Sequence, residues 1–93
     1  MSDYEIREIA RRVVLRYFQS WGQSLQERIE ALNAAIKAVN IKAEFIQDER
    51  GTGWIGKEGE KAAKFRKELD KCFPIGSFEE EEQAVVTLIN SWA

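Results

Sequence analysis

The sequence predicts an all-α fold, a compact bundle of about four helices in a single domain that spans residues 1–93. Two patterns carry this prediction. Apolar residues recur at intervals that alternate between four and three, and three Ser-x-x-Glu patterns mark the starts of helices. A hydrophobic content of 44% is enough for one core in a chain of 93 residues. The domain is therefore expected to fold without a metal ion or a disulfide.

The first two helices are expected at residues 3–20 and 24–49. Each begins with a capping box, in which Ser2 or Ser24 precedes a glutamate by three residues. The second helix carries the longest apolar stripe of the chain, which would lie on one side of the helix. The stripe consists of Leu25, Ile29, Leu32, Ile36, Val39, Ala43 and Ile46. It predicts one long central helix as the spine of the bundle.

Residues 41–56 also fit a small β-hairpin. Residues 41–45 alternate between apolar and polar with a period of two, and Gly51-Thr52-Gly53 could turn the chain back into Trp54 and Ile55. Asn40 would then end the second helix. The unbroken apolar stripe favours the helix, and the hairpin remains the alternative.

The last two helices are expected at residues 58–72 and 78–92. The third helix follows a glycine-rich loop and ends before Pro74, because the residue before a proline avoids the helical region. The fourth begins with a capping box at Ser77 and opens with four glutamates, which the helix dipole stabilises at that end. Short connections between the helices predict antiparallel neighbours.

Composition argues against several classes of protein. A formal charge of −2 gives no overall field that attracts nucleic acid or anionic lipid, and no apolar run is long enough to span a bilayer. The single cysteine, Cys72, and the absence of a signal-peptide pattern predict a cytoplasmic protein with a buried, reduced thiol. Histidine, the commonest general base and zinc ligand, is absent. We therefore expect no catalytic residue, no cofactor and no metal.

The segment from Gly51 to Lys57 matches two nucleotide-binding patterns in part. It satisfies G-x-G-x-x-G and most of G-x-x-x-x-G-K-[ST], but Glu58 stands where the second pattern needs a hydroxyl for magnesium. We interpret the match as coincidence. Backbone N–H groups at the start of the third helix, together with Lys57, would still suit a small anion.

Lysines recur along one face of the third helix and form a possible nucleic-acid surface. They are Lys57, Lys61, Lys64, Lys67 and Lys71. Glu60 and Glu68 fall within the same arc and lower its charge, so an ordinary solvated helix face is the favoured interpretation.

The preferred functional hypothesis is a small protein–protein interaction module: an adaptor, regulator or inhibitor that docks onto another protein. Apolar residues on two sides of the first and second helices also predict a homodimer. Candidate partner-binding residues are the apolar or aromatic ones outside the main stripe, with two arginines as a charged rim. They are Leu15, Phe18, Phe45 and Trp54, with Arg12 and Arg16.

Two alternatives remain. The first is a nucleic-acid-binding regulator that uses the lysines of the third helix. The second and more remote alternative is a magnesium-dependent, all-helical nucleotide hydrolase, for which the second helix offers carboxylates at helical spacing. They are Glu27, Glu30, Glu44 and Asp48.

Overall fold

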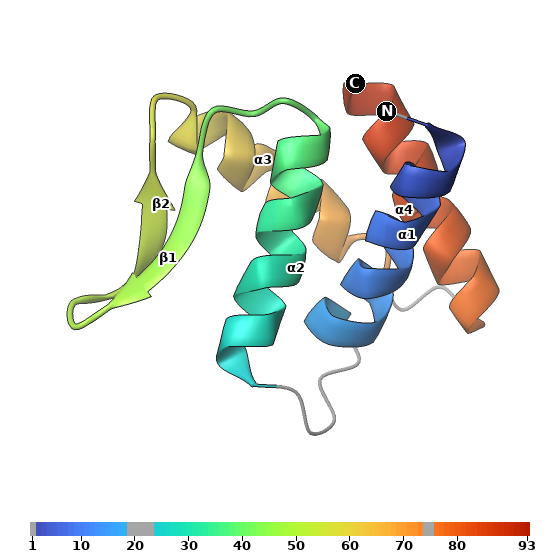
Figure 1. The fold of residues 1–93 in the computed structure, drawn as a ribbon, viewed down its shortest axis with the longest axis horizontal. Helices are drawn as coiled ribbons and strands as arrows, with labels where there is room; N and C mark the ends of the chain where they lie inside the picture. The colour runs from blue at the N-terminus through green and yellow to red at the C-terminus, as the bar shows by residue number, and fades with distance from the viewer. Residues whose placement is uncertain (1, 19–23, 74–75) are drawn as a thin grey trace.

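Four helices and a small antiparallel hairpin form the fold, as the computed structural model of residues 2–18, 24–73 and 76–93 describes it (Figure 1). The elements are α1 (Asp3–Arg12), the π-helical segment η1 (Val13–Phe18), α2 (Leu25–Ala38), β1 (Glu44–Asp48), β2 (Gly51–Ile55), α3 (Gly59–Asp70) and α4 (Phe78–Trp92). The predicted four-helix architecture is confirmed. In the described residues, no helix has the length and apolar character needed to cross a membrane.

The helix starts lie where the capping boxes place them. The side chains of Ser2, Ser24 and Ser77 accept hydrogen bonds from the backbone N–H three residues ahead, at 3.2, 3.2 and 3.3 Å. Each bond satisfies one of the N–H groups that a helix leaves without a partner in its first turn. The third helix differs, because Glu58 precedes it without a side-chain cap.

The expected long helix over 24–49 is wrong in its second half, because α2 ends at Ala38. Asn40 adopts the left-handed conformation, with a φ of 58°. The N–H of Asn40 then bonds the carbonyl of Lys37 at 3.0 Å, and the N–H of Ile41 bonds that of Ile36 at 3.2 Å. This is the Schellman ending of a helix, with asparagine at the position where glycine or asparagine is preferred. A local cap therefore ends the helix although the apolar stripe continues.

The hairpin alternative is the correct one for the segment after Ala43, although its turn lies elsewhere. Phe45 pairs with Trp54, and Asp48 pairs with Gly51, so that a two-residue loop joins the strands. The Asp48 carboxylate accepts a bond from the N–H of Arg50 at 2.8 Å, and Gly51 takes a φ of 117°. The residues expected to form the turn, Gly51 to Gly53, belong to β2 instead.

The base of the hairpin is fixed to the start of α3. The N–H of Lys42 donates to the Glu58 carboxylate at 2.7 Å, and the N–H of Glu58 donates to the Lys42 carbonyl at 3.1 Å. Gly56 has a φ of 109°, and a Cβ there would lie 2.6 Å from the Lys42 carbonyl oxygen. Only glycine allows the two chain segments to approach so closely.

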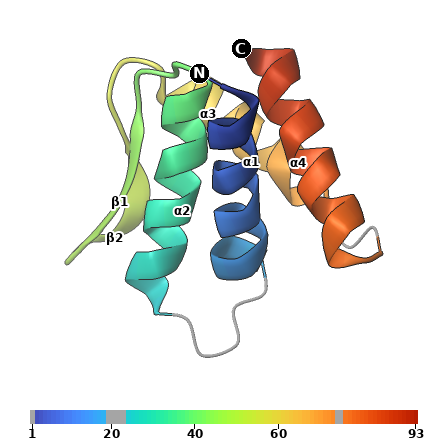
Figure 2. The ribbon, with the colours of Figure 1, turned by 45° about the vertical axis from the view of Figure 1, so that its right-hand side comes forward.

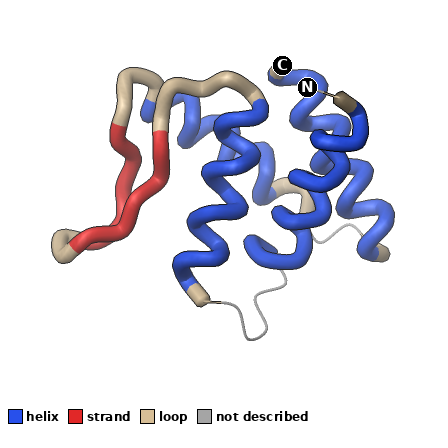
Figure 3. Tube along the Cα trace, viewed as in Figure 1, coloured by secondary structure: helices blue, strands red, loops and turns tan. Residues whose placement is uncertain are grey.

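The core forms where α1 and η1 pack between α2 and α4, as Figure 2 shows. Its largest fully buried side chains are Phe65, Leu32, Ile36, Leu69, Ile89, Val13, Val14 and Val85. The hairpin lies along the other side of α2 (Figure 3). The second apolar side of α2, including Ala31 and Ala38, is therefore buried within one chain. Self-association is not needed to cover it.

Candidate functional site

A pocket of about 110 Å³ lies between η1, α2, the hairpin and α3, and we call it the arginine pocket. Its lining combines two arginines and two aromatic rings with aliphatic side chains and a threonine. These residues are Tyr17, Leu25, Arg28, Ile29, Leu32, Phe45, Thr52 and Arg66. Polar groups that converge on an apolar concavity are typical of binding sites.

Tyr17 holds both arginines in place. Its hydroxyl donates to the Asp70 carboxylate at 3.0 Å and accepts from Nε of Arg66 at 2.9 Å. Its backbone carbonyl accepts from Nε of Arg28 at 3.3 Å. Tyr17 belongs to the π-helical segment η1. Helices of this type are rare in proteins, and those that occur are often found at functional sites. Tyr17 thus anchors both guanidinium groups, each through its Nε atom.

Each of the two guanidinium groups lies over an aromatic ring. The Cζ atom of Arg66 lies 4.8 Å from the centroid of the Phe45 ring, and that of Arg28 lies 5.8 Å from the centroid of Tyr17. Arginine stacks on aromatic rings because its guanidinium is planar and weakly hydrated. Stacking and the Nε bonds together restrict how either group can rotate.

The two positive charges of the arginine pocket have no ion-pair partner among residues 2–18, 24–73 and 76–93. Arg7 and Arg11, in contrast, both pair with Glu82, at 3.4 and 3.1 Å. Toward described residues, Arg28 and Arg66 donate through Nε alone. Their Nη nitrogens form the fork that matches a carboxylate or phosphate.

The hydroxyl of Tyr17 stays protonated at neutral pH. Burial raises its pKa above the ordinary value of 10.0, and the charge of Asp70 raises it further, while Arg66 acts in the opposite direction. The hydroxyl therefore remains a donor to Asp70, and the chain from Asp70 through Tyr17 to Arg66 persists at physiological pH.

The candidate partner-binding residues do not form one surface. Leu15 is 48% exposed, and Arg12 and Arg16 are exposed on the same helical segment. Phe18 is half-buried and stacks on Phe73. Leu15 and the two arginines thus remain accessible to a partner.

Phe45 was expected at the surface and lies in the core instead, with 8% of the residue exposed. Trp54 is half-buried and packs against it, with the two ring centroids 4.9 Å apart. The hairpin folds both rings toward α2 and α3. Phe45 therefore contributes to the arginine pocket as the ring beneath Arg66.

The five lysines of the predicted nucleic-acid surface are all exposed along α3 and its flanks. They are Lys57, Lys61, Lys64, Lys67 and Lys71. Glutamates lie among them: Glu58 pairs with Lys61 at 3.7 Å, and Glu68 accepts a bond from the indole N–H of Trp92. The stripe is a mixed-charge face with a local excess of lysine.

The glycine-rich segment does not form a phosphate loop. Gly51 and Gly53 belong to a strand, and the Glu58 carboxylate lies at the start of α3, where a phosphate would bind. Negative charge at that position opposes the binding of an anion there.

Neither the carboxylates nor the thiol forms a reactive cluster in the part of the chain that the structure describes. No three His, Cys, Asp or Glu residues there come together as a metal site requires. Cys72 is 8% exposed and donates to the carbonyl of Glu68 at 3.7 Å. Burial raises the pKa of its thiol, and the charges of Asp70 and Glu68 raise it further. Since the thiolate is the reactive form, Cys72 is poorly reactive.

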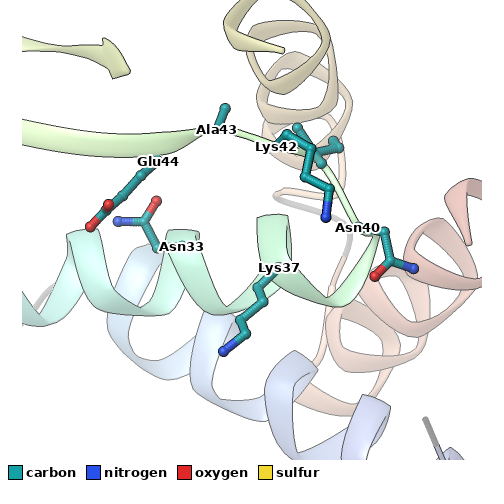
Figure 4. A pocket seen from close by; sticks show the side chains of 7 residues that line it. Asn33, Lys37, Asn40, Lys42, Ala43 and Glu44 are labelled. Carbon is teal, nitrogen blue, oxygen red and sulfur yellow. The ribbon is translucent and has the colours of Figure 1, made fainter. Parts of the chain in front are cut away.

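A larger hollow of about 400 Å³ lies at the end of α2 (Figure 4). Its polar side chains do not converge. Asn33 points toward β1 beside Glu44, whereas Lys37 extends away from the strand. The Asn33 amide is also occupied by two hydrogen bonds to the backbone of Phe45. The arginine pocket is therefore the better candidate for a binding site.

Sequence patterns did not single out Tyr17, Arg28, Thr52 or Arg66 as functional residues. The only local sign is that Arg28 and Arg66 each stand next to a core residue, Ile29 and Phe65. No family model, curated protein or solved structure matches the chain. The function has to be inferred from the geometry of the site.

Proposed function

We propose that the protein is an interaction module that binds an acidic segment of another protein at the arginine pocket. One observation carries the proposal: Tyr17 anchors the Nε atoms of Arg28 and Arg66, both arginines line the pocket, and their Nη atoms donate to no described residue. Charge-assisted, bidentate hydrogen bonds of this kind are among the strongest polar contacts that a protein surface makes.

The size and lining of the pocket favour an acidic side chain with an apolar neighbour. A volume of about 110 Å³ accepts a side chain rather than a folded element. Leu25 lines the same pocket and is 43% exposed, so an apolar residue beside the carboxylate would bury it. The proposed ligand is therefore a segment in which Glu or Asp stands next to leucine or isoleucine.

The proposal assigns the protein a binding role rather than a catalytic one, and places it in the cytoplasm. It fits the buried, weakly acidic thiol of Cys72, which a reducing compartment keeps free. The exposed Leu15 and Arg12 would add contacts with the partner outside the pocket.

Fluorescence anisotropy with a labelled Glu/Leu peptide and a matched Gln/Leu peptide tests the proposal. We expect the wild-type protein to bind the acidic peptide and to lose affinity as the salt concentration rises. The substitutions Arg28→Gln and Arg66→Gln should each weaken binding by roughly 10-fold to 100-fold, the equivalent of a lost charged hydrogen bond. Lys37→Gln, which removes one positive charge from an exposed position of α2 outside the pocket, should change affinity much less. Equal binding of both peptides would contradict the proposal, and so would an equal loss in all three variants.

A second candidate is binding of nucleic acid along α3, because five lysines are exposed on this helix and its flanks. Under this hypothesis, reversing the charge of Lys61, Lys64 and Lys71 should abolish salt-sensitive binding to a mixed-sequence oligonucleotide. The Gln variants of Arg28 and Arg66 should leave that binding nearly unchanged. Absence of oligonucleotide binding at low salt would end this second hypothesis.

A further inference from the structure

The two edges of the hairpin differ in whether their backbone groups have partners. On β1, the N–H of Phe45 donates to the Asn33 side chain at 2.7 Å, and the Phe45 carbonyl accepts from it at 2.8 Å. Both groups of Phe45 therefore point away from β2 and toward α2. A side-chain amide takes the place that a neighbouring strand would have on this edge.

The geometry of antiparallel strands then fixes the other edge. Phe45 pairs with Trp54, so these two residues form a pair that exchanges no hydrogen bonds within the hairpin. Trp54 and Thr52, two residues apart, direct their N–H and C=O groups away from β1. Among the described residues none of these four groups has a hydrogen-bond partner outside the hairpin. Figures 1 and 3 show β2 on the side of β1 that is far from α2.

We propose that this edge of β2 pairs in antiparallel fashion with β2 of a second copy of the chain. The result is a four-stranded sheet in the order β1-β2-β2-β1, with a two-fold axis at Gly53. Thr52 then exchanges both of its hydrogen bonds with Trp54 of the second copy. Natural proteins protect exposed edges with lysine, proline or covering elements, and Gly51–Ile55 contains no lysine or proline.

Gly53 suits the position on the axis. In this register it faces Gly53 of the second copy in a pair without hydrogen bonds, where Cα atoms approach to about 4.5 Å. A Cβ at Gly53 would meet nothing within 4 Å in a single chain, so the fold of one copy does not require glycine there. The close approach of two copies would explain why position 53 is a glycine.

Charge and apolar surface agree with the same register. It places the loop residue Glu49, which precedes β2, at the same end of the sheet as Lys57 of the second copy, which follows β2, and the two-fold axis repeats this arrangement. Ile55 is 47% exposed and pairs with Glu44 on the outer face of the hairpin. In the proposed register, Ile55 lies opposite Gly51 of the second copy. A two-stranded hairpin is marginally stable alone, and a sheet of four strands is more stable. Thr52 belongs both to this edge and to the lining of the arginine pocket, and the dimer does not depend on the proposed function.

Sedimentation equilibrium of the full chain tests the dimer. We expect a dimer for the wild-type protein and a monomer for Gly53→Glu, because two carboxylates would face each other across the axis. The helical circular dichroism of the variant should match that of the wild type. Gln47→Glu adds the same charge to β1, away from the axis, and should remain dimeric. A monomeric wild-type protein, or a dimer that tolerates Gly53→Glu, would overturn the proposal.

A charge exchange tests the register. Glu49→Lys and Lys57→Glu should each raise the dimer dissociation constant, by about threefold to tenfold, since exposed ion pairs are individually weak. The double variant should restore most of the wild-type affinity, because the opposite charges face each other again. A double variant that dimerises no better than either single variant would overturn the proposed pairing.

Discussion

Replacing Asn33 with alanine should weaken the attachment of the hairpin to the bundle. The Asn33 amide makes two hydrogen bonds to the backbone of Phe45, at 2.7 and 2.8 Å, and the Phe45 side chain is buried. Each bond contributes about 1 kcal/mol net, and the groups left behind are incompletely hydrated, which gives a loss of about 2–3 kcal/mol. Alanine is a better helix former than asparagine by about 0.6 kcal/mol. The expected net loss in the free energy of unfolding is therefore about 2 kcal/mol.

For a domain of this size, such a loss corresponds to a fall in Tm of about 10 °C. Urea denaturation followed by circular dichroism measures the free energy, and native-state hydrogen exchange at the Phe45 N–H measures the local effect. Asn90→Ala is the matched control, because Asn90 is exposed on α4. It should be neutral or slightly stabilising. The reasoning is refuted if Asn33→Ala is as stable as this control, or if exchange at Phe45 is unchanged.

Three further predictions concern titration, a buried charge and a helix end. Folding raises the pKa of Tyr17, so the contribution of this residue to stability is complete below pH 10 and is lost as the pH rises through the folded pKa. A pH series of denaturation curves should show the free energy of unfolding falling in this range, and the fall should be smaller in Tyr17→Phe. Glu82 is 5% exposed and pairs with Arg7 and Arg11, so Glu82→Gln should lower the free energy of unfolding by about 1 kcal/mol in urea, and an unchanged value would show that the exposed arginines contribute nothing. Asn40 has a φ of 58°, so Asn40→Ala should lower the free energy of unfolding by about 1–2 kcal/mol, while Asn40→Gly is tolerated. Calorimetry that ranks the two variants in the opposite order would disprove the Schellman assignment.

The starts of three helices could be predicted because capping is local. The serine that accepts the bond and the N–H that donates it lie three residues apart, so the pattern is visible in the sequence. The end of α2 is also local, at Asn40. The sequence prediction misses this end of the helix, because Ala43 and Ile46 fit the helical stripe as well as they fit a strand. Periodicity did not distinguish them, whereas the left-handed asparagine did.

The arginine pocket could not be predicted in the same way. Tyr17, Arg28, Phe45 and Arg66 come from four separate elements, and no spacing in the sequence connects them. The surface role expected for Phe45 rested on the assumption that an apolar residue away from the main stripe stays uncovered. That assumption is wrong, because the hairpin turns Phe45 toward α2 and α3. Contacts between distant segments decide which arginines remain unpaired.

Chemical-shift mapping by NMR tests the central claim most directly, that Arg28 and Arg66 bind an acidic segment. A titration of the labelled protein with the Glu/Leu peptide should shift the Nε–Hε signals of both arginines, and the backbone signals of Leu25 and Thr52, which line the same pocket. The Gln/Leu peptide should leave these signals unchanged. Shifts that instead follow Lys61 and Lys64 along α3, or no shift at the arginines with the acidic peptide, would contradict the account.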